Sequence, residues 1–150
     1  MFYNGFPDSA LYLVLDLKAV YYDDWALGWA RILGTGYVEN PLGRKVDPVF
    51  RITGSRTDLK ITQVATGKSI EFRNLVMRNT DTIVIDTRER YKTADIIHAD
   101  GTKETMLGRY VWDNVDMSLP LEAGSNALFV ESFGEPDNLE VIMSLPYLSV

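Results

Sequence analysis

The stretch that decides the fold is residues 59–73, which have the sequence LKITQVATGKSIEFR. Two runs of alternating apolar and polar residues flank the turn ATGK, and a period of two is typical of a β-strand with one buried face. Gly67 supplies the positive φ that such a turn requires. The alternation brings Ile61 within reach of Ile70 and Phe72 on one shared apolar face. We therefore expect two antiparallel strands here.

A second local pattern predicts a β-hairpin further along the chain. Residues 95–106 have the sequence DIIHADGTKETM, with Asp100-Gly101 between two extended runs. Asp-Gly is strongly preferred at the two central positions of a type I′ turn, where both residues have positive φ. We expect a two-residue hairpin turn at this point.

The same spacing extends outward from these two stretches. From about residue 48, apolar runs are broken by turn residues at roughly the 8–12-residue spacing of antiparallel sandwiches and barrels. We expect residues 82–86, which open with four β-branched residues, to lie at a sheet centre, and we expect residues 127–132 to pair with residues 139–145. The sequence thus predicts an all-β fold, an antiparallel β-sandwich of the jelly-roll or galectin-like type. The predicted inward side chains are Phe50, Ile52, Ile61, Ile70, Phe72, Ile83, Ile85, Leu128, Val130, Val141 and Met143.

The first 45 residues follow a different pattern. Residues 11–16 are a candidate strand. Residues 23–33 fit either a helix capped by Asp23 or an irregular strand around Gly28. We favour a strand over residues 29–33.

The breaker NPLG at residues 40–43 marks the entry to the sandwich. We expect an amino-terminal arm with linking strands over residues 1–45 and the β-sandwich domain over residues 46–150. The arm opens with aromatic residues that show no periodicity, and it has no core of its own to join. We therefore expect it either to fray or to dock on another chain, and Phe2, Tyr3 and Phe6 are the residues that would make the contact.

Composition narrows the functional classes. With 46% hydrophobic and 24% charged residues, the chain has the balance of an ordinary globular domain. No apolar run approaches the ~20 residues of a membrane helix, so we expect no membrane insertion. The chain has no Cys, which excludes disulfides and thiolate metal sites. Its net charge of -6 argues against nucleic acid as a partner, and no pattern indicates a cofactor.

The order of the segments is more specific than any one of them. NPLG at residues 40–43 leads to DPVFRITG at 47–54, then to Thr66-Gly67, IVIDT at 83–87, Asp100-Gly101 and LPLEAGSN at 119–126. This succession resembles the carboxy-terminal galectin-like sandwich domain of siphovirus distal tail and minor tail proteins, and it covers residues 38–150. The chain departs from that pattern at Ala123, where the family often has Pro. It also has only about 40 residues where the family usually carries a ring-forming domain.

The resemblance implies a structural component of a bacteriophage or phage-like tail or baseplate. Such a protein is not an enzyme and needs no cofactor. It is made in the host bacterial cytoplasm and resides in the virion, where it assembles with other tail subunits, here as an expected homo-oligomeric ring. The residues that match the family also have expected roles in the fold. Some end strands, Gly54 and Gly124 form turns, and the side chains of Asp86 and Asn126 are expected to bond to nearby backbone.

The charged residues offer few candidates for chemistry. His98 is the only histidine, and we expect it to serve the surface or packing. Paired carboxylates can cleave glycosides, but only at a set separation within a cleft. The pairs Asp23/Asp24, Asp81/Asp86 and Asp113/Asp116 fall instead at expected turns and strand ends.

A basic strip is the first candidate interaction surface. Arg88, Arg90 and Lys92 alternate, so an extended chain would carry all three on one face. Such a strip fits either a solvated edge or a contact with the acidic surface of a neighbouring subunit.

An aromatic pair is the second candidate. Tyr110 and Trp112 would share one face of a strand, which suits packing in the core or against a partner. The same rings also suit a sugar platform. The alternative function is therefore a carbohydrate-binding module that contacts the host cell envelope, with a glycan as its partner.

Overall fold

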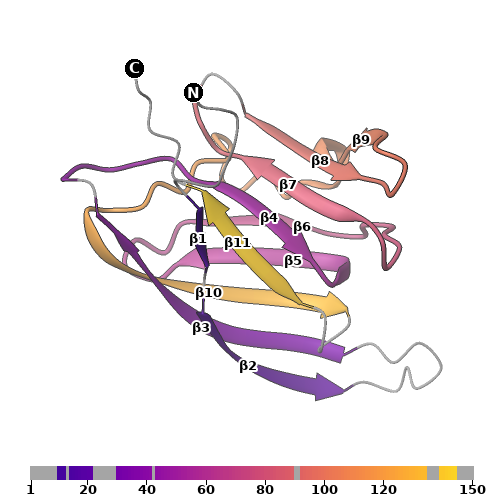
Figure 1. Cartoon of the computed structure of the whole chain (residues 1–150), viewed down its shortest axis with the longest axis horizontal. Coiled ribbons are helices and arrows are strands. Elements are labelled where there is room, and N and C mark those ends of the chain that lie inside the picture. Colours follow the sequence, from indigo (N-terminus) through magenta and orange to yellow (C-terminus); the bar gives the residue numbers. More distant parts are fainter. Residues whose placement is uncertain are drawn as a thin grey trace.

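The computed structural model describes residues 10–12, 14–21, 30–41, 43–89, 92–134 and 139–144. These residues form two antiparallel sheets that pack against each other, and they contain no α-helix (Figure 1). The predicted all-β sandwich is confirmed.

The first sheet has six strands in the order β1-β11-β4-β7-β8-β9. Its centre is β4 beside β7, so the β-branched run at residues 82–86 does lie centrally. The bounds are β1 Ala10–Tyr12, β11 Glu140–Ser144, β4 Val49–Thr53, β7 Thr82–Asp86, β8 Thr93–Ile97 and β9 Lys103–Thr105.

The second sheet has five strands in the order β2-β3-β10-β5-β6. Its centre is β10, which pairs with β3 on one side and β5 on the other. The bounds are β2 Val14–Tyr21, β3 Ala30–Asn40, β10 Gly124–Gly134, β5 Ser55–Gln63 and β6 Ser69–Phe72.

The core lies between the two sheets. All the residues of the predicted inward set are buried, and the most exposed of them, Val141, keeps only 2% of its surface. Alternation predicts this reliably because successive side chains on a strand point to opposite faces. The β5–β6 hairpin is also confirmed, since Ile61 pairs with Ile70 and Gly67 has a φ of 74°.

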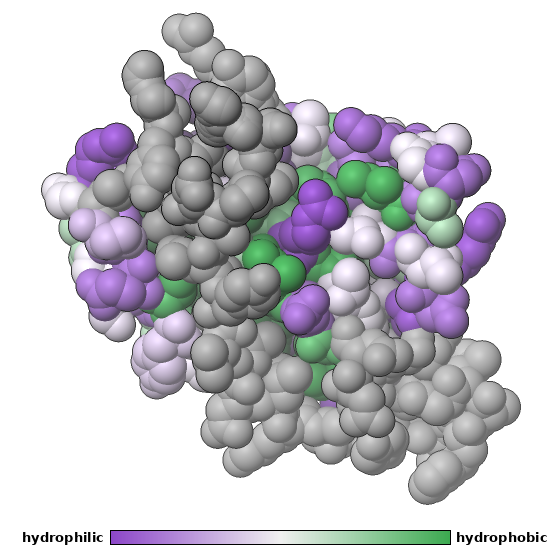
Figure 2. Space-filling view, viewed as in Figure 1, coloured by the Kyte–Doolittle hydropathy of each residue, from purple (hydrophilic) through white to green (hydrophobic). Residues whose placement is uncertain are grey.

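Irregular segments contribute further core residues that the alternation did not predict. Leu75 and Met77 come from the β6–β7 connection, Leu119 and Leu121 come from the segment before β10, and all four are buried. On the outside, Figure 2 shows apolar side chains near the middle of one face, with hydrophilic ones both among them and along the rim.

The predicted two-residue turn at Asp100-Gly101 is wrong. The N–H of His98 donates to the carbonyl of Thr102 (2.9 Å) and the N–H of Gly101 donates to the carbonyl of His98 (2.9 Å), which makes a three-residue loop. Gly101 has a φ of 88°, whereas Asp100 is not in the positive-φ region. A turn followed by a left-handed glycine also fits the twist of a hairpin, and Asp100 stabilises it by accepting from the N–H of Thr102 (3.0 Å).

The predicted pairing of residues 127–132 with residues 139–145 is also wrong. Both runs are strands, but β10 lies in the five-stranded sheet and β11 pairs with β4 and β1 in the six-stranded sheet. Alternation shows which face of a strand is apolar, but two strands with buried faces can complete the core from opposite sheets.

The segment before residue 46 supplies strands to both sheets. β1 pairs with β11, whereas β3 pairs with β10 over its whole length. The strand predicted over residues 29–33 is confirmed from residue 30 onward. Residues 22–29 and the arm residues Phe2, Tyr3 and Phe6 lie outside the described residues, so the division at residue 46 stays a prediction.

Candidate interaction site

A surface loop at residues 110–118, between β9 and β10, is held by several internal hydrogen bonds and is called the pinned loop below. It follows a short 3-10 helix at Leu107–Arg109 and begins at Tyr110, which forms a single β-bridge with Phe72. The two rings are 5.1 Å apart between centroids. The hydroxyl of Tyr110 donates to the carbonyl of Asn114 (2.6 Å), so one buried side chain attaches the loop to β6 and also fixes its turn.

Asn114 closes this loop from within. Its Nδ2 donates to the carbonyl of Ser69 at the start of β6 (3.1 Å) and to the carbonyl of Ser118 (2.8 Å). The N–H of Met117 donates in turn to the carbonyl of Asn114 (3.0 Å). These hydrogen bonds hold the loop in one conformation. Its side chains therefore need little further ordering when a partner binds, which lowers the entropy cost of binding.

The loop exposes two large apolar side chains. Trp112 keeps 54% of its surface and Val115 keeps 69%. The ring of Trp112 lies edge-on to that of Tyr110, with centroids 4.7 Å apart and planes at 88°. Trp112 is therefore both exposed and supported from behind.

The sequence-based expectation of two rings on one strand face is wrong. Tyr110 is only 5% exposed, and the chain turns directly after it instead of continuing as a strand. A period of two applies only while the chain stays extended. Tyr110 therefore acts as an anchor, and Trp112 is the one of the pair that offers a surface.

A polar hollow of ≈ 380 Å³ lies beside Val115. Residues of the β5–β6 turn form one wall and residues of the pinned loop form the other. Its lining consists of Thr66, Gly67, Lys68, Ser69, Asp113, Asn114, Val115 and Asp116. The hollow offers carboxylate, amide, hydroxyl and ammonium groups within one small space.

The electrostatics of the loop keep its anchor neutral. Burial raises the pKa of Tyr110 to about 12, and the nearby carboxylates of Asp113 and Asp116 act in the same direction. The Tyr110 hydroxyl therefore remains a hydrogen-bond donor to Asn114 throughout the ordinary pH range.

The predicted basic strip does not form as expected. Arg88 lies in the β7–β8 connection, where its Nη2 is 2.6 Å from Oδ2 of Asp86. Asp86 also accepts from the N–H of Arg88 (3.0 Å), which is the side-chain turn expected at this position. Lys92 donates from Nζ to the carbonyl of Asp116 in the pinned loop. Arg90 lies outside the described residues.

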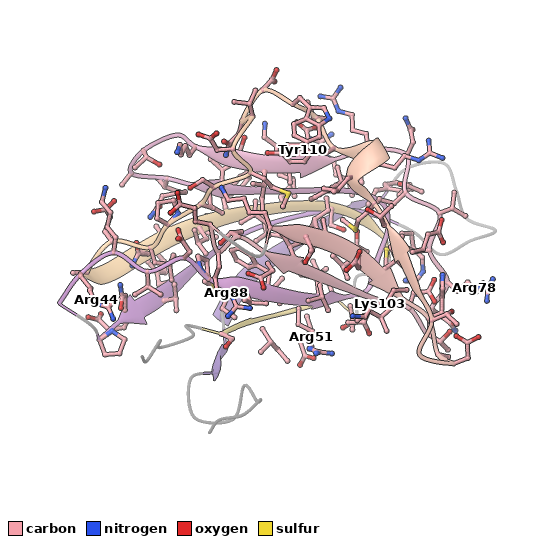
Figure 3. All side chains as sticks on the ribbon, turned by 90° about the horizontal axis from the view of Figure 1, so that it is seen from above. Arg44, Arg51, Arg78, Arg88, Lys103 and Tyr110 are labelled. Carbon is pink, nitrogen blue, oxygen red and sulfur yellow. The ribbon has the colours of Figure 1, made fainter. Side chains whose placement is uncertain are left out.

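Two residues of the predicted basic strip therefore have different partners. Lys92 binds the pinned loop, which the sequence did not connect with it, whereas Arg88 binds its sequence neighbour Asp86. Figure 3 shows Tyr110 and Arg88 well separated in the view from above. The alternation rule failed here because the described residues between β7 and β8 are not strand residues.

A second hollow of ≈ 430 Å³ lies against the outer face of the five-stranded sheet. Arg31 contacts Glu131 across β3 and β10 (3.2 Å), and Arg73 contacts Glu71 at the β6 end (2.8 Å). The remaining lining residues are Asp58, Leu59, Lys60, Ser132 and Phe133. The acids and bases that line it are equal in number, so this surface is polar without a net charge.

His98 lies between two carboxylates at the β8–β9 turn. Its Nδ1 is 2.9 Å from Oδ1 of Asp81, and its Nε2 is 3.2 Å from Oε1 of Glu104. The hydrogen bond to Asp81 raises the pKa of His98. Burial of Asp81 opposes its ionisation, but hydrogen bonds from the N–H of Arg78 and from His98 outweigh that effect and lower the pKa of Asp81.

Two further observations concern the described residues as a group. No three of their His, Asp or Glu side chains are arranged to hold a metal ion. None of their helices is long and apolar enough to cross a membrane.

The comparisons with known proteins add no family to this description. No protein-family model matches the chain significantly, and neither does any curated protein or any solved structure.

Proposed function

We propose that this protein is a structural component of a bacteriophage or phage-like tail or baseplate, and that it acts by subunit assembly instead of catalysis. The observation that carries the proposal is the exposure of Trp112 on a loop that internal hydrogen bonds hold in one conformation. A few aromatic side chains typically dominate the energy of a protein interface. A preorganised loop also lowers the entropy cost of binding.

The order of segments that resembles tail proteins supports the same proposal. The matching residues occupy positions that keep the sandwich rigid. Gly54 and Gly124 have φ angles of 93° and 89°. Asn126 accepts from the N–H of Glu122 (2.8 Å) and donates to the carbonyl of Gly124 (3.0 Å), as the sequence predicted. A protein that works by position requires this kind of framework.

The experiment is co-purification of the tagged full chain with the tail and baseplate proteins encoded beside its gene. We expect the wild-type chain to retain tail proteins, and Trp112→Ala to retain them at least tenfold less, in line with a loss of about 1.4 kcal/mol or more. Val76→Ala is the matched control, since Val76 is 79% exposed and lies in the β6–β7 connection, outside the pinned loop's own sequence. Equal retention by all three proteins would contradict the proposal.

The amino-terminal arm is tested in the same assay. Deletion of residues 1–9, which removes Phe2, Tyr3 and Phe6, is expected to leave the described strands folded and to reduce retention. If the truncated chain retains tail proteins as well as the full chain does, the arm is not part of the contact. The pinned loop with Trp112 is then the one contact that remains in the proposal.

Carbohydrate binding is the second candidate, and the polar hollow beside Val115 favours it. Carboxylate and amide groups near an exposed indole are what sugar hydroxyls and the apolar sugar face require. Titration with soluble fragments of the host cell envelope, followed by indole fluorescence, tests this candidate. A saturable change that Trp112→Ala and Asp113→Ala each abolish would favour the glycan over the tail protein as the occupant of this loop.

A further inference from the structure

Three of the four sheet edges in the described part of the chain are short or covered. β1 and β9 have three residues each, and residues 103–105 of β9 are all exposed and mostly charged. β6 has four residues, and residues 109–111 cover its outer side, where the N–H of Val111 donates to the carbonyl of Glu71 (2.9 Å). Short edges, charges and covering segments are the devices that prevent unwanted pairing between sheets.

β2 is the exception. It is eight residues long and stands at the end of the five-stranded sheet, where it pairs with β3 from Val14 opposite Tyr37 to Tyr21 opposite Ala30. No described strand pairs with its other side, and Figure 1 shows it at the margin of the molecule. A long regular edge presents a row of backbone N–H and C=O groups that can template a further strand.

We propose that β2 pairs antiparallel with β2 of a second copy of this chain, which joins the two five-stranded sheets into one. This inference rests on the proposed function, because it names a partner and a contact for assembly. A two-fold pair of this kind uses the same strand from both copies and closes on itself.

The sequence of β2 is self-complementary in one register. When the two strands are centred on Leu17, Asp16 of each copy stands opposite Lys18 of the other. Residues directly opposite on antiparallel strands are close neighbours, and opposite charges there stabilise the pair. The same register sets Leu15 opposite Ala19 and Val14 opposite Val20.

Neighbouring registers are unfavourable for the same reason. Centring the pair on Asp16 would set two aspartates opposite each other, and centring it on Lys18 would set two lysines opposite each other. Like charges directly opposite are destabilising. The single charged pair within VLDLKAVY therefore favours this alignment over its neighbours.

The experiment is sedimentation velocity of the full chain across a wide range of concentration, with three β2 variants. We expect the wild-type chain to form a dimer. Asp16→Lys and Lys18→Asp should each weaken the dimer by about tenfold, because two-fold symmetry turns two attractive pairs into two repulsive ones. The double variant Asp16→Lys/Lys18→Asp restores opposite charges and should dimerise like the wild-type chain.

Mixing the two single variants provides a second test. The Asp16→Lys chain carries two lysines on β2 and the Lys18→Asp chain carries two aspartates. We expect the two to form a mixed dimer more tightly than either forms its own. Lys103→Asp on β9 is the matched control and should leave the wild-type dimer unchanged, and equal thermal melting of all chains shows that each is folded.

The β2 pairing is overturned if the wild-type chain stays monomeric in the absence of other proteins. It is also overturned if the single variants dimerise as tightly as the wild-type chain. If the monomeric chain still retained tail proteins through Trp112, the proposed function would stand without this contact. Dimerisation with the charge pattern described, by a chain that retains no tail protein, would support the β2 pairing and contradict the proposed function.

Discussion

Two asparagines pin two segments of this protein, and the segments serve different ends. Asn126 on β10 holds the corner at residues 121–124, and Asn114 holds the loop that carries Trp112. Asn126 is 4% exposed and also accepts from Nε2 of Gln63 on the neighbouring strand (2.9 Å). The side chain of Asn114 donates only to backbone carbonyls. The loop that it holds exposes Trp112, two residues earlier.

The difference shows how one chemical device gives two results. Asn126 is itself buried and one of its bonds reaches the buried Gln63, so the network closes the sandwich. Around Asn114 the bonds lie beneath the loop, so the network displays an indole. An amide side chain can replace missing backbone partners in either setting, because it offers both a donor and an acceptor.

The largest expected effect is that of Asn126→Ala. The change removes this partner from the N–H of Glu122, the Nε2 of Gln63 and two carbonyls, in a site that is buried at Gln63 and part-buried at the others. We expect a loss of about 2–4 kcal/mol in the free energy of unfolding, measured by urea denaturation. Asn126→Asp keeps the acceptor but turns a carboxylate oxygen toward the two carbonyls to which Nδ2 donates, so it should not recover the loss. A cost below about 0.5 kcal/mol would show that the corner is not held by Asn126.

Asn114→Ala should cost less, about 1–2 kcal/mol, because the loop is nearer to solvent. Its distinctive result should be local. We expect faster amide hydrogen exchange over residues 112–117 with unchanged exchange in β10, and weaker retention of tail proteins. Unchanged exchange in the loop would mean that Tyr110 alone holds Trp112 in place.

The backbone of the corner offers a third test. Gly124 has a φ of 89°, and a Cβ there would meet no atom within 4 Å. Gly124→Ala should therefore cost about 1–2 kcal/mol through backbone strain alone. Gly43→Ala is the matched control, since Gly43 is equally uncrowded and its φ is outside the positive range. Equal thermal melting of the two variants would contradict this reading of the corner.

The β8–β9 turn differs from the two asparagine networks because the hydrogen bonds of His98 depend on pH. The folded-state pKa of His98 is raised above 6.5, so its stabilisation is fully present below about pH 6.5 and is lost as the pH rises through the raised value. The pKa of Asp81 is lowered from 3.8, so its contribution is present above that value and is lost on acidification through the lowered one. The two asparagine networks should show no such dependence.

The measurement is the melting temperature of the wild-type chain minus that of His98→Gln, from about pH 5 to about pH 9, a window around the ordinary titration of histidine. We expect this small difference to shrink as the pH rises. Asn114→Ala provides the comparison, and its difference from the wild-type chain should stay level. A difference that grows with pH would contradict the assigned pairing of His98 and Asp81.

The two asparagines also show why one site was predictable and the other was not. Asn126 stands two residues after a glycine and directly before an apolar alternating run, which is a local turn pattern. Asn114 stands in the stretch WDNVDM at residues 112–117, where apolar and polar residues follow no strand period, and its partner Ser69 is 45 residues away. Likewise nothing local indicates that Lys92 donates to Asp116.

The sequence by itself determined the all-β class, the inward faces of β4, β5, β6, β7, β10 and β11 and the positions of several turns, because alternation and glycine geometry are local properties. Only the tertiary structure decided that β10 and β11 belong to different sheets, that β9 follows a three-residue loop, and that Tyr110 is buried while Trp112 is exposed. These outcomes depend on which strands meet across the core, and burial and hydrogen bonding between distant residues are set only when the two sheets pack.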